Sequence, residues 1–252
     1  MVKKDRKQKT SKRKLLKQER LKREKQKRLL TLVSIVGIAL VLIGFVIIPT
    51  VHTSLNPIGD YVQITPESIP LAEGTAIGDP NSAIKIEVFE DFKCSACRNY
   101  TERIEPLVIS NHASKGEIYY VIYNYPFLDD ESPTKDSDRA ATASQCAAEQ
   151  NRFWDFHKML YANLNFTPNE FSEERMLAFA DALNLNMEKF TECFENNAVQ
   201  AIIDENLNKG PEMGVTGTPS IYINGVNIKP GFVPTYEEIK AAIEADLNET
   251  GG

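Results

Sequence analysis

The stretch EDFKCSACRNY, residues 90–100, carries two cysteines at the point where a predicted strand gives way to a predicted helix. The residues that lead into it, AIKIEVFE at 83–90, alternate apolar and polar side chains and predict a strand. From Ser95 onward apolar residues recur at helical spacing, and Pro106 predicts a kink or break in that helix. Cys94 is therefore predicted at the junction of a strand and a helix.

A thiol at the start of a helix faces the free N–H groups of the first turn and the positive end of the helix dipole. Both favour the thiolate and lower the pKa of the thiol, which makes a Cys-x-x-Cys pair reactive. Lys93 is expected to add positive charge beside Cys94. Cys94 is thus the predicted attacking thiol, and Cys97, one helical turn further on and less exposed, the predicted resolving thiol.

Two other uses of such a pair fit this sequence poorly. A structural zinc site needs a second pair of ligands, whereas Cys146 and Cys193 lie 47 residues apart without a local partner. A purely structural disulfide between Cys94 and Cys97 would stabilise little, because the stabilisation grows with the length of the closed loop. Neither a metal ion nor another cofactor is expected.

The remainder of the chain indicates an α/β domain. EIYYVIYNY at 117–125 predicts a strand that is covered on both faces, and helical patterns fill the region from about 134 to 210. TPSIYINGVNIKP at 218–230 then predicts two short strands joined by a tight turn at Asn224-Gly225, and a last helix follows. The order strand, helix, strand, several helices, hairpin and helix predicts three layers around a mixed sheet.

Two helix starts carry capping signals: Ser172 precedes one of the inserted helices, and Thr235 with Glu238 has the spacing of a capping box. A further feature is GVTGTPSIYING at 214–225, where Pro219 stands at a strand start. This proline is interpreted either as part of a cis peptide in a purposeful tight turn or as an ordinary turn proline.

The first fifty residues differ from the rest. Residues 1–28 hold 15 Lys and Arg against 3 Asp and Glu, so the chain begins with a basic arm and continues with an excess of acids. Residues 29–48 contain no charge and would span about 30 Å as a helix, which predicts a transmembrane anchor. A cleaved signal peptide is the alternative, but no small-residue cleavage site follows Ile48.

The orientation follows from the charges that flank this run. The basic arm is expected in the cytoplasm, against anionic lipid headgroups rather than nucleic acid, and residues 50–252 outside it. Residues 49–82 carry five prolines and are predicted to form a mostly extended linker, in which YVQIT at 61–65 could add an edge strand. All four cysteines fall in the outer part, where conditions favour disulfides.

Three motifs in this order resemble the DsbA-like branch of the thioredoxin superfamily: FEDFKCSACRNY, CAAEQNRFWDFHKMLYANL and GVTGTPSIYINGV. The resemblance covers residues 78–247. It implies a thioredoxin fold over 83–247 with an all-helical insertion at about 134–210. It also implies that Cys94 attacks, that Cys97 is its partner, and that Thr218-Pro219 forms a cis-proline loop whose Thr218 contacts an extended substrate segment.

The sequence departs from the best-known members of this family at two places. Ser95 and Ala96, the dipeptide that tunes the pair, include neither histidine nor proline. Thioredoxins often carry a buried acid six residues before the first cysteine, where this chain has Val88. Glu90 and Asp91 lie closer to the cysteine and could serve in proton transfer, but they are interpreted as solvated loop acids.

The other two cysteines lie in the helical insertion. Cys146 and Cys193 would close a 47-residue loop, so a structural disulfide is predicted, with two buried free thiols as the alternative. His157, on an amphipathic stretch, is interpreted as a core or interface histidine rather than a neighbour of the active thiol.

The resemblance, taken together with the predicted anchor and its orientation, predicts a membrane-tethered thiol–disulfide oxidoreductase that acts outside the cytoplasm. The leading hypothesis is an oxidase that introduces disulfides into exported proteins and is reoxidised by a separate, quinone-linked membrane partner. An extracytoplasmic reductase uses the same chemistry in reverse. A tethered binding or chaperone module without turnover is the alternative from another class.

Overall fold

The computed structural model describes residues 23, 25, 27, 28, 30–43, 58–128 and 131–250, and the chain divides into two units at Pro57. In the first unit, residues 30–43 are helical and carry exposed apolar side chains. No helix within these described residues is both long and apolar enough to cross a membrane. The anchor predicted at 29–48 extends beyond the described residues at both ends. Most of the basic arm and all of 49–57 also lie outside them.

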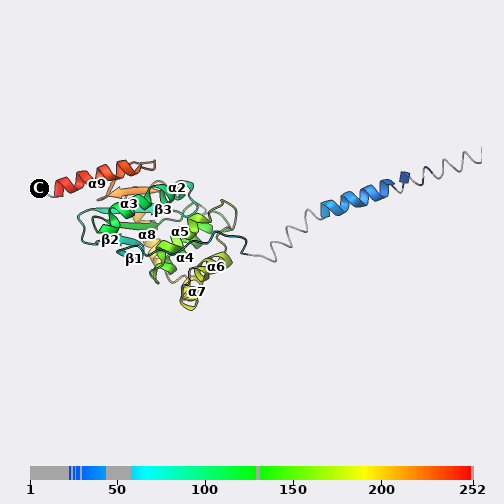
Figure 1. The fold of residues 1–252 in the computed structure, drawn as a ribbon, viewed down its shortest axis with the longest axis horizontal. Helices are drawn as coiled ribbons and strands as arrows, with labels where there is room; N and C mark the ends of the chain where they lie inside the picture. The colour runs from blue at the N-terminus through cyan, green and yellow to red at the C-terminus, as the bar shows by residue number, and fades with distance from the viewer. Residues whose placement is uncertain are drawn as a thin grey trace, which may run out of the picture. The chain divides into compact units, whose positions relative to one another are not determined.

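The second unit is built on a mixed sheet, whose six described strands follow the order β1-β2-β4-β3-β5-β6 (Figure 1). The strands are β1 (Ala72–Glu73), β2 (Ala76–Gly78), β3 (Lys85–Glu90), β4 (Tyr119–Asn124), β5 (Ser220–Ile223) and β6 (Val226–Asn227). β3 and β4 are parallel, and the other neighbours are antiparallel. Asn224 and Gly225, which join β5 to β6, both have positive φ, as the predicted turn requires. The expected mixed sheet is confirmed.

The predicted linker at 49–82 was wrong over its second part, because residues from Ile58 onward belong to the folded unit. β1 and β2 lie inside that range, whereas YVQIT forms no strand. Side chains of the helical part hold this segment: Asn163 exchanges hydrogen bonds with both backbone groups of Val62, and Arg175 donates to the carbonyl of Ile58. Strands of two and three residues are too short to produce a pattern of period two, so no sequence pattern predicts them.

The helices follow the predicted positions closely. They are α2 (Ser95–Arg103), α3 (Glu105–Asn111), α4 (Asp136–Ala148), α5 (Phe153–Ala162), α6 (Glu173–Ala182), α7 (Met187–Glu195), α8 (Gln200–Glu212) and α9 (Tyr236–Thr250), with a short 3₁₀ turn at Ala113–Lys115. The break between α2 and α3 falls at Ile104, two residues before Pro106, where a kink or break was predicted. Ser172 caps α6 by accepting from the N–H of Arg175, and Thr235 and Glu238 exchange the two bonds of a capping box.

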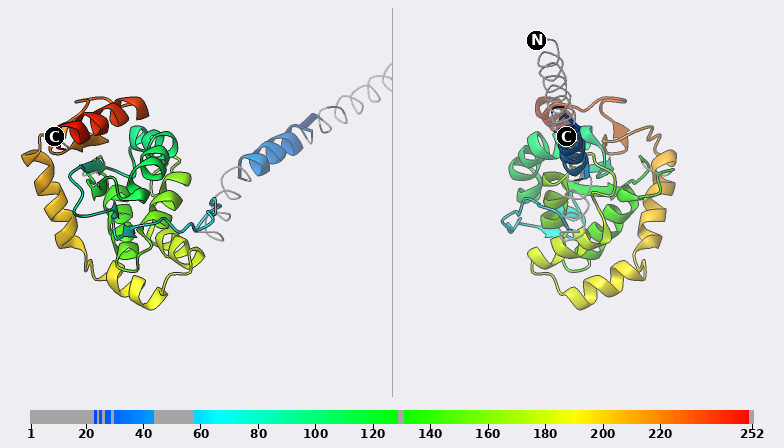
Figure 2. Two further views of the ribbon diagram at one scale, coloured as in Figure 1. Left: turned by 60° about the vertical axis from the view of Figure 1, so that its left-hand side comes forward. Right: turned by 90° about the vertical axis from the view of Figure 1, so that its right-hand side faces the viewer.

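The apolar side chains form separate clusters on the two faces of the sheet and inside the helical part. Ile86 and Val88 of β3 pack in the cluster that includes residues of α2, α3 and α9, while Phe89, on the opposite face, packs in a smaller one. The third cluster joins α4 to α8 and contains both Cys94 and Cys97. Figure 2 (left) shows α7 in yellow and α8 in gold, running along the outside of this unit before the chain enters β5. The two thiols thus lie where the sheet ends and the helical insertion begins.

Candidate functional site

Cys94 occupies the position between strand and helix that the sequence predicts. β3 ends at Glu90 and α2 begins at Ser95, so Cys94 is the N-cap residue, with φ −84° and ψ 121°. Its Sγ accepts a hydrogen bond from the backbone N–H of Cys97 at 3.5 Å. Cys94 keeps 9% of its surface exposed, whereas Cys97 is fully buried. The pair therefore has one sulfur near the surface and one inside.

The segment around Pro219 is distant from this pair in the sequence but lies against it in the fold. The peptide bond between Thr218 and Pro219 is cis, and the carbonyl oxygen of Thr218 accepts a hydrogen bond from Cys94 Sγ at 3.2 Å. Thr218 lies 124 residues away from Cys94 in the sequence. The fold thus brings together the four residues that the resemblance singled out.

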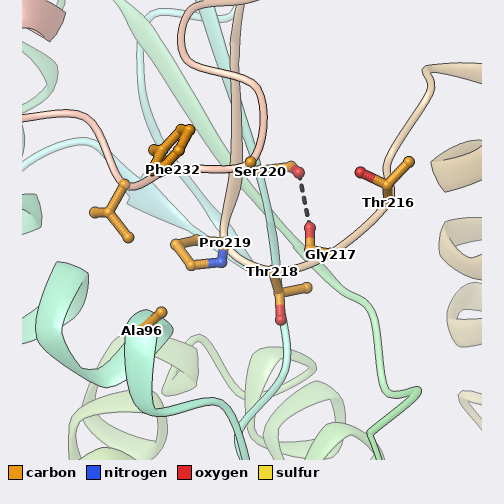
Figure 3. Close-up of a pocket in the computed structure, with 9 residues that line it drawn as sticks. Ala96, Thr216, Gly217, Thr218, Pro219, Ser220 and Phe232 are labelled. Carbon is orange, nitrogen blue, oxygen red and sulfur yellow. Dashed lines mark hydrogen bonds between the residues drawn. The ribbon is translucent and has the colours of Figure 1, made fainter.

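A cavity of about 240 Å³ lies beside the two segments (Figure 3). Ala96 contributes one wall and the stretch 216–220 another, where the hydroxyl of Ser220 donates to the carbonyl of Gly217 at 2.7 Å. Phe232, 71% exposed, belongs to the third wall. Sequence reasoning missed Phe232, because a single aromatic residue in the loop before α9 resembles any surface residue. A hollow lined by backbone and one exposed aromatic ring suits an extended peptide.

The pKa values of the two thiols are shifted in opposite directions. The hydrogen bond from the Cys97 thiol is the largest of the influences that lower the pKa of Cys94, to about 6, against the effect of partial burial. The backbone N–H groups of Cys97 and Ala96 lower it further. Complete burial raises the pKa of Cys97 well above its ordinary value, and the negative charges of Cys94 and Glu90 add to that. At neutral pH the reduced pair is one thiolate and one thiol.

Lys93 does not act as the free positive charge that the sequence suggested. Its ammonium group pairs with the carboxylate of Glu170 and lies 3.7 Å from Asp136. Asp136 also pairs with Arg139 at 2.9 Å. Because two acids neutralise Lys93, the thiolate of Cys94 depends on hydrogen bonds and on the helix start instead.

Asp91 and Glu90 are both 1% exposed, so the interpretation as solvated loop acids was wrong. Asp91 is a structural centre. Its Oδ2 accepts from the N–H groups of Phe127 and Leu128, and its Oδ1 accepts from the N–H of Lys93 and the hydroxyl of Ser137. Burial raises the pKa of Asp91, although these bonds oppose the rise. Asp91 therefore fastens the turn before Cys94 to the segment that follows β4.

Glu90 takes part in a second buried group of polar side chains. Its Oε1 pairs with Nε2 of His157 at 2.7 Å, and Nδ1 of His157 lies 3.8 Å from Oε2 of Glu105. His157 is 1% exposed, which agrees with its interpretation as a core histidine. Sequence reasoning missed Glu105. The available signal was its position three residues before Val108, on the buried face of α3.

Cys146 of α4 and Cys193 of α7 are joined by a disulfide, with an S–S distance of 1.99 Å and a Cα–Cα distance of 5.8 Å. Cys94 and Cys97 are free thiols. Across the described ranges, no group of three or more His, Cys, Asp or Glu residues is arranged to hold a metal ion. Of the dipeptide between Cys94 and Cys97, Ser95 is exposed and Ala96 half-buried.

Comparisons with known proteins also indicate a thioredoxin-like domain. A family model described as thioredoxin (Thioredoxin_4) matches residues 71–245. The probable disulfide bond formation protein D of Bacillus cereus is 25% identical over 218 residues, which cover 84% of this chain and 96% of that protein. Disulfide bond formation protein D of Bacillus subtilis is 26% identical over 175 residues, covering 68% and 76%.

Solved structures share the fold. The crystal structure of oxidised BdbD from Bacillus subtilis matches with a TM-score of 0.61 at 24% identity, over 75% of this chain and all of that one. The crystal structure of DsbA from Chlamydia trachomatis matches with a TM-score of 0.58 at 22% identity, over 76% and 97%. The predicted thioredoxin fold with a helical insertion is thereby confirmed.

Proposed function

This chain belongs to the thioredoxin family and is a DsbA-like thiol–disulfide oxidoreductase, and we propose that it works as a membrane-tethered oxidase outside the cytoplasm. In this proposal the disulfide of Cys94 and Cys97 is passed to exported proteins that contain cysteines. The basic arm remains in the cytoplasm, and residues 29–48 hold the catalytic domain at the extracytoplasmic face of the membrane that they span.

The observation that carries the proposal is the difference in acidity between the two sulfurs. A thiolate at Cys94 stabilises the reduced pair, and a pair that is stable when reduced oxidises others. The pKa of about 6 lies between the values of about 7 for thioredoxin and about 3.5 for DsbA. The lowered pKa of Cys94 supports oxidation of substrates, because it stabilises the reduced form of the pair.

The chemistry proceeds through a mixed disulfide. A substrate thiolate attacks Cys94 Sγ, the bond to Cys97 breaks, and Cys97 leaves as the thiolate. A second thiolate of the substrate then attacks the substrate sulfur of the mixed disulfide and releases Cys94. The enzyme is left as a dithiol. A separate membrane partner, which we expect to be quinone-linked, accepts the two electrons and restores the disulfide.

The cavity beside the pair supports an extended substrate segment. In this role the backbone at Thr218 offers hydrogen-bonding groups next to Cys94, and Pro219 leads directly into β5. Phe232 offers an apolar contact for the side chain that precedes or follows the substrate cysteine. Ser95 and Ala96, which lie between the cysteines and add no charge, tune the equilibrium between the disulfide and the dithiol.

Two further parts of the proposal rest on separate observations. Exposed apolar side chains on the helical residues 30–43 support the membrane anchor, since such a surface needs an apolar environment. The Cys146–Cys193 bond supports a structural role for the second pair, because it ties α4 to α7 within the helical part.

Trapping of mixed disulfides tests the activity of the pair. The full-length Cys97→Ser variant is expected to accumulate disulfide-linked exported proteins through Cys94, and these should disappear on reduction. Cys94→Ser in the same background is the matched control and should trap none. If Cys97→Ser traps nothing, the chain is a binding module and the catalytic proposal fails.

The direction of electron flow is tested by equilibrium with glutathione. An oxidase should be half-reduced at a glutathione ratio more oxidising than the one that half-reduces thioredoxin. An equilibrium at or below that of thioredoxin would assign the protein as a reductase instead. The fraction of dithiol is measured by alkylation and mass spectrometry after acid quenching.

A further inference from the structure

A loop of the helical insertion lies against the start of α2. This loop, residues 163–171, joins α5 to α6. Nζ of Lys93, the residue just before the attacking thiol, donates to the carbonyl of Thr167 at 3.2 Å. Nη1 of Arg98, in α2, donates to the carbonyl of Leu164 at 2.9 Å. The residues between these two carbonyls are therefore fixed beside the reactive end of α2.

The loop 163–171 and the 240 Å³ cavity lie on different sides of α2. Ala96 lines the cavity (Figure 3), whereas Arg98 reaches the loop. Positions two apart on a helix differ by about 200° around its axis, so these two side chains leave α2 in nearly opposite directions. None of the loop residues lines that cavity. A substrate segment bound at Cys94 therefore has the cavity on one side and the loop on the other.

Buried polar contacts give the loop a fixed conformation. The carboxylate of Glu170 pairs with Lys93 and also accepts from the backbone N–H of Asn165. Arg139 of α4 donates to the carbonyl of Phe171 at 2.8 Å. Glu170 is buried, and a charged group is tolerated there only when it is paired and hydrogen-bonded. A loop fixed in this way can present a side chain to a ligand with little loss of conformational entropy.

Phe166 is the side chain that this loop presents. Its φ is 59°, in the left-handed region that bulky residues rarely adopt and that costs backbone energy. The residue is nevertheless 52% exposed, so packing within the domain compensates little of that cost. Asn169 has a φ of 58° in the same loop, but asparagine tolerates this conformation. An exposed aromatic residue held in a strained conformation beside a reactive thiol calls for a role outside the fold.

Leu71 offers a direct comparison, because it has a φ of 60° and is 54% exposed. Its conformation has a structural reason: it turns the chain into β1, and its carbonyl accepts from the N–H of Gly78 at 3.0 Å. Gly78 pairs with Tyr119 at the start of β4, which is parallel to β3. Leu71 therefore lies at the opposite end of the sheet from Cys94, which follows the end of β3.

We propose that Phe166 is a specificity-determining residue, which packs against an apolar side chain of the substrate on the side of Cys94 that faces the helical insertion. This inference rests on the proposed oxidation of exported proteins by Cys94 and Cys97. It adds a second apolar contact to that of Phe232, which lies on the side of the cavity. Apolar residues are mostly buried once a protein has folded, so Phe166 favours substrate chains that are still unfolded.

The test compares three peptides that each contain two cysteines. They carry phenylalanine directly before the first cysteine, phenylalanine directly after it, or serine at both positions, and they are otherwise identical. Oxidised full-length protein in detergent is mixed with each peptide at neutral pH and quenched in acid at intervals. Alkylation and mass spectrometry then follow the loss of the Cys94–Cys97 disulfide. The second-order rate constant is measured for the wild type and each variant, with glutathione as a fourth reductant.

Phe166→Asn is expected to lower the rate constant for at least one phenylalanine peptide by about fivefold, because an apolar contact is lost. The serine peptide and glutathione, which lack such a side chain, should change by less than about twofold. Phe166→Gly should behave like Phe166→Asn, and Phe166→Leu should retain most of the rate. Asparagine and glycine both tolerate a positive φ, so these two variants should fold and melt at or above the temperature of the wild type.

Leu71→Asn is the matched control, since it makes the same exchange at the same φ at the far end of the sheet. It should leave all four rate constants unchanged.

Three results would overturn the role of Phe166. The first is a wild type that oxidises the serine peptide as fast as both phenylalanine peptides. The second is an unchanged rate for both phenylalanine peptides in Phe166→Asn and Phe166→Gly. The third is an equal slowing of all four reductants, which would show a general effect on the cysteine pair. If the wild type oxidises no peptide and Cys97→Ser traps no exported protein, the proposed function itself fails, and this inference fails with it.

Discussion

Cys94 and Cys97 stand two residues apart and are free thiols, whereas Cys146 and Cys193 stand 47 residues apart and share a disulfide. The first pair sits at the start of α2, with N–H donors on one side and an open cavity on the other. The second pair joins two helices within the helical part, and Cys146 is only 1% exposed.

The surroundings of a cysteine, and not its residue type, therefore determine its role. A helix start and a neighbouring thiol keep Cys94 ionised and reactive at neutral pH. A long closed loop and burial make the Cys146–Cys193 bond a constraint on the unfolded chain. Four experiments test this contrast between the two cysteine pairs, in order of decreasing expected effect.

Removal of the reactive sulfur should have the largest effect. Cys94→Ser is expected to lower the rate of oxidation of a dithiol peptide by more than about 10³-fold, because a hydroxyl cannot replace the thiolate in disulfide exchange. Fluorescence of the peptide, which changes on disulfide formation, provides the measurement. The double variant Cys146→Ser, Cys193→Ser is the control and should retain most of the rate at 25 °C. Equal losses in both proteins would remove the distinction between the pairs.

The double variant should instead lose stability. A 47-residue loop is expected to contribute up to about 4 kcal/mol to the free energy of unfolding. Urea denaturation followed by circular dichroism, in detergent and without reductant, measures this difference. Cys94→Ser serves as the comparison, and its free energy of unfolding should stay close to that of the reduced wild type at pH 5, where Cys94 is mostly protonated. A loss below about 0.5 kcal/mol in the double variant would contradict a structural role.

The acidity of Cys94 predicts a pH dependence in the reduced protein. With a pKa of about 6, the rate of alkylation by iodoacetamide should fall about tenfold from pH 7 to pH 5 and change little above pH 7. Because the folded pKa lies below the unfolded value, the thiolate stabilises the reduced protein most strongly above the unfolded pKa. This contribution decreases as pH falls below the unfolded pKa and is lost as pH falls through the folded pKa of about 6. A profile that still rises steeply from pH 7 to pH 9 would show an ordinary thiol.

The smallest effect is expected for Lys93. Because Glu170 and Asp136 neutralise its ammonium group, Lys93→Met should change the alkylation rate of Cys94 at pH 6 by less than twofold. The same variant should lower stability, since the buried carboxylate of Glu170 loses its cation, whereas Asp136 keeps Arg139. A rate that falls fivefold or more would show that the charge of Lys93 does support the thiolate.

Much of the fold could be predicted because the sequence carries strong local signals. The alternation of β3, the helical repeat of α2, the proline next to the break at Ile104 and the Asn224-Gly225 turn each fix local structure through steric or hydrogen-bonding preferences. The order of these elements then restricts the sheet to a few arrangements.

The missed features all depend on contacts between distant residues. β1 and β2 are held by pairing with β4 and by packing, which no local pattern announces. Glu90 looks like a loop acid until His157, 67 residues later, is brought to 2.7 Å from it. Lys93 looks like a free cation until Glu170 from the helical insertion meets it. Charges acquire their roles only from the tertiary fold.

Asp91 has a practical consequence for redesign. Its carboxylate gathers four donors and fixes the turn that presents Cys94, while the two residues between the cysteines carry little of the frame, Ser95 being exposed and Ala96 half-buried. Libraries at positions 95 and 96 should therefore vary the redox equilibrium without loss of expression or folding. The two residues between the cysteines can be exchanged while the turn fixed by Asp91 stays constant. A series of variants with graded redox equilibria could therefore be selected for disulfide engineering.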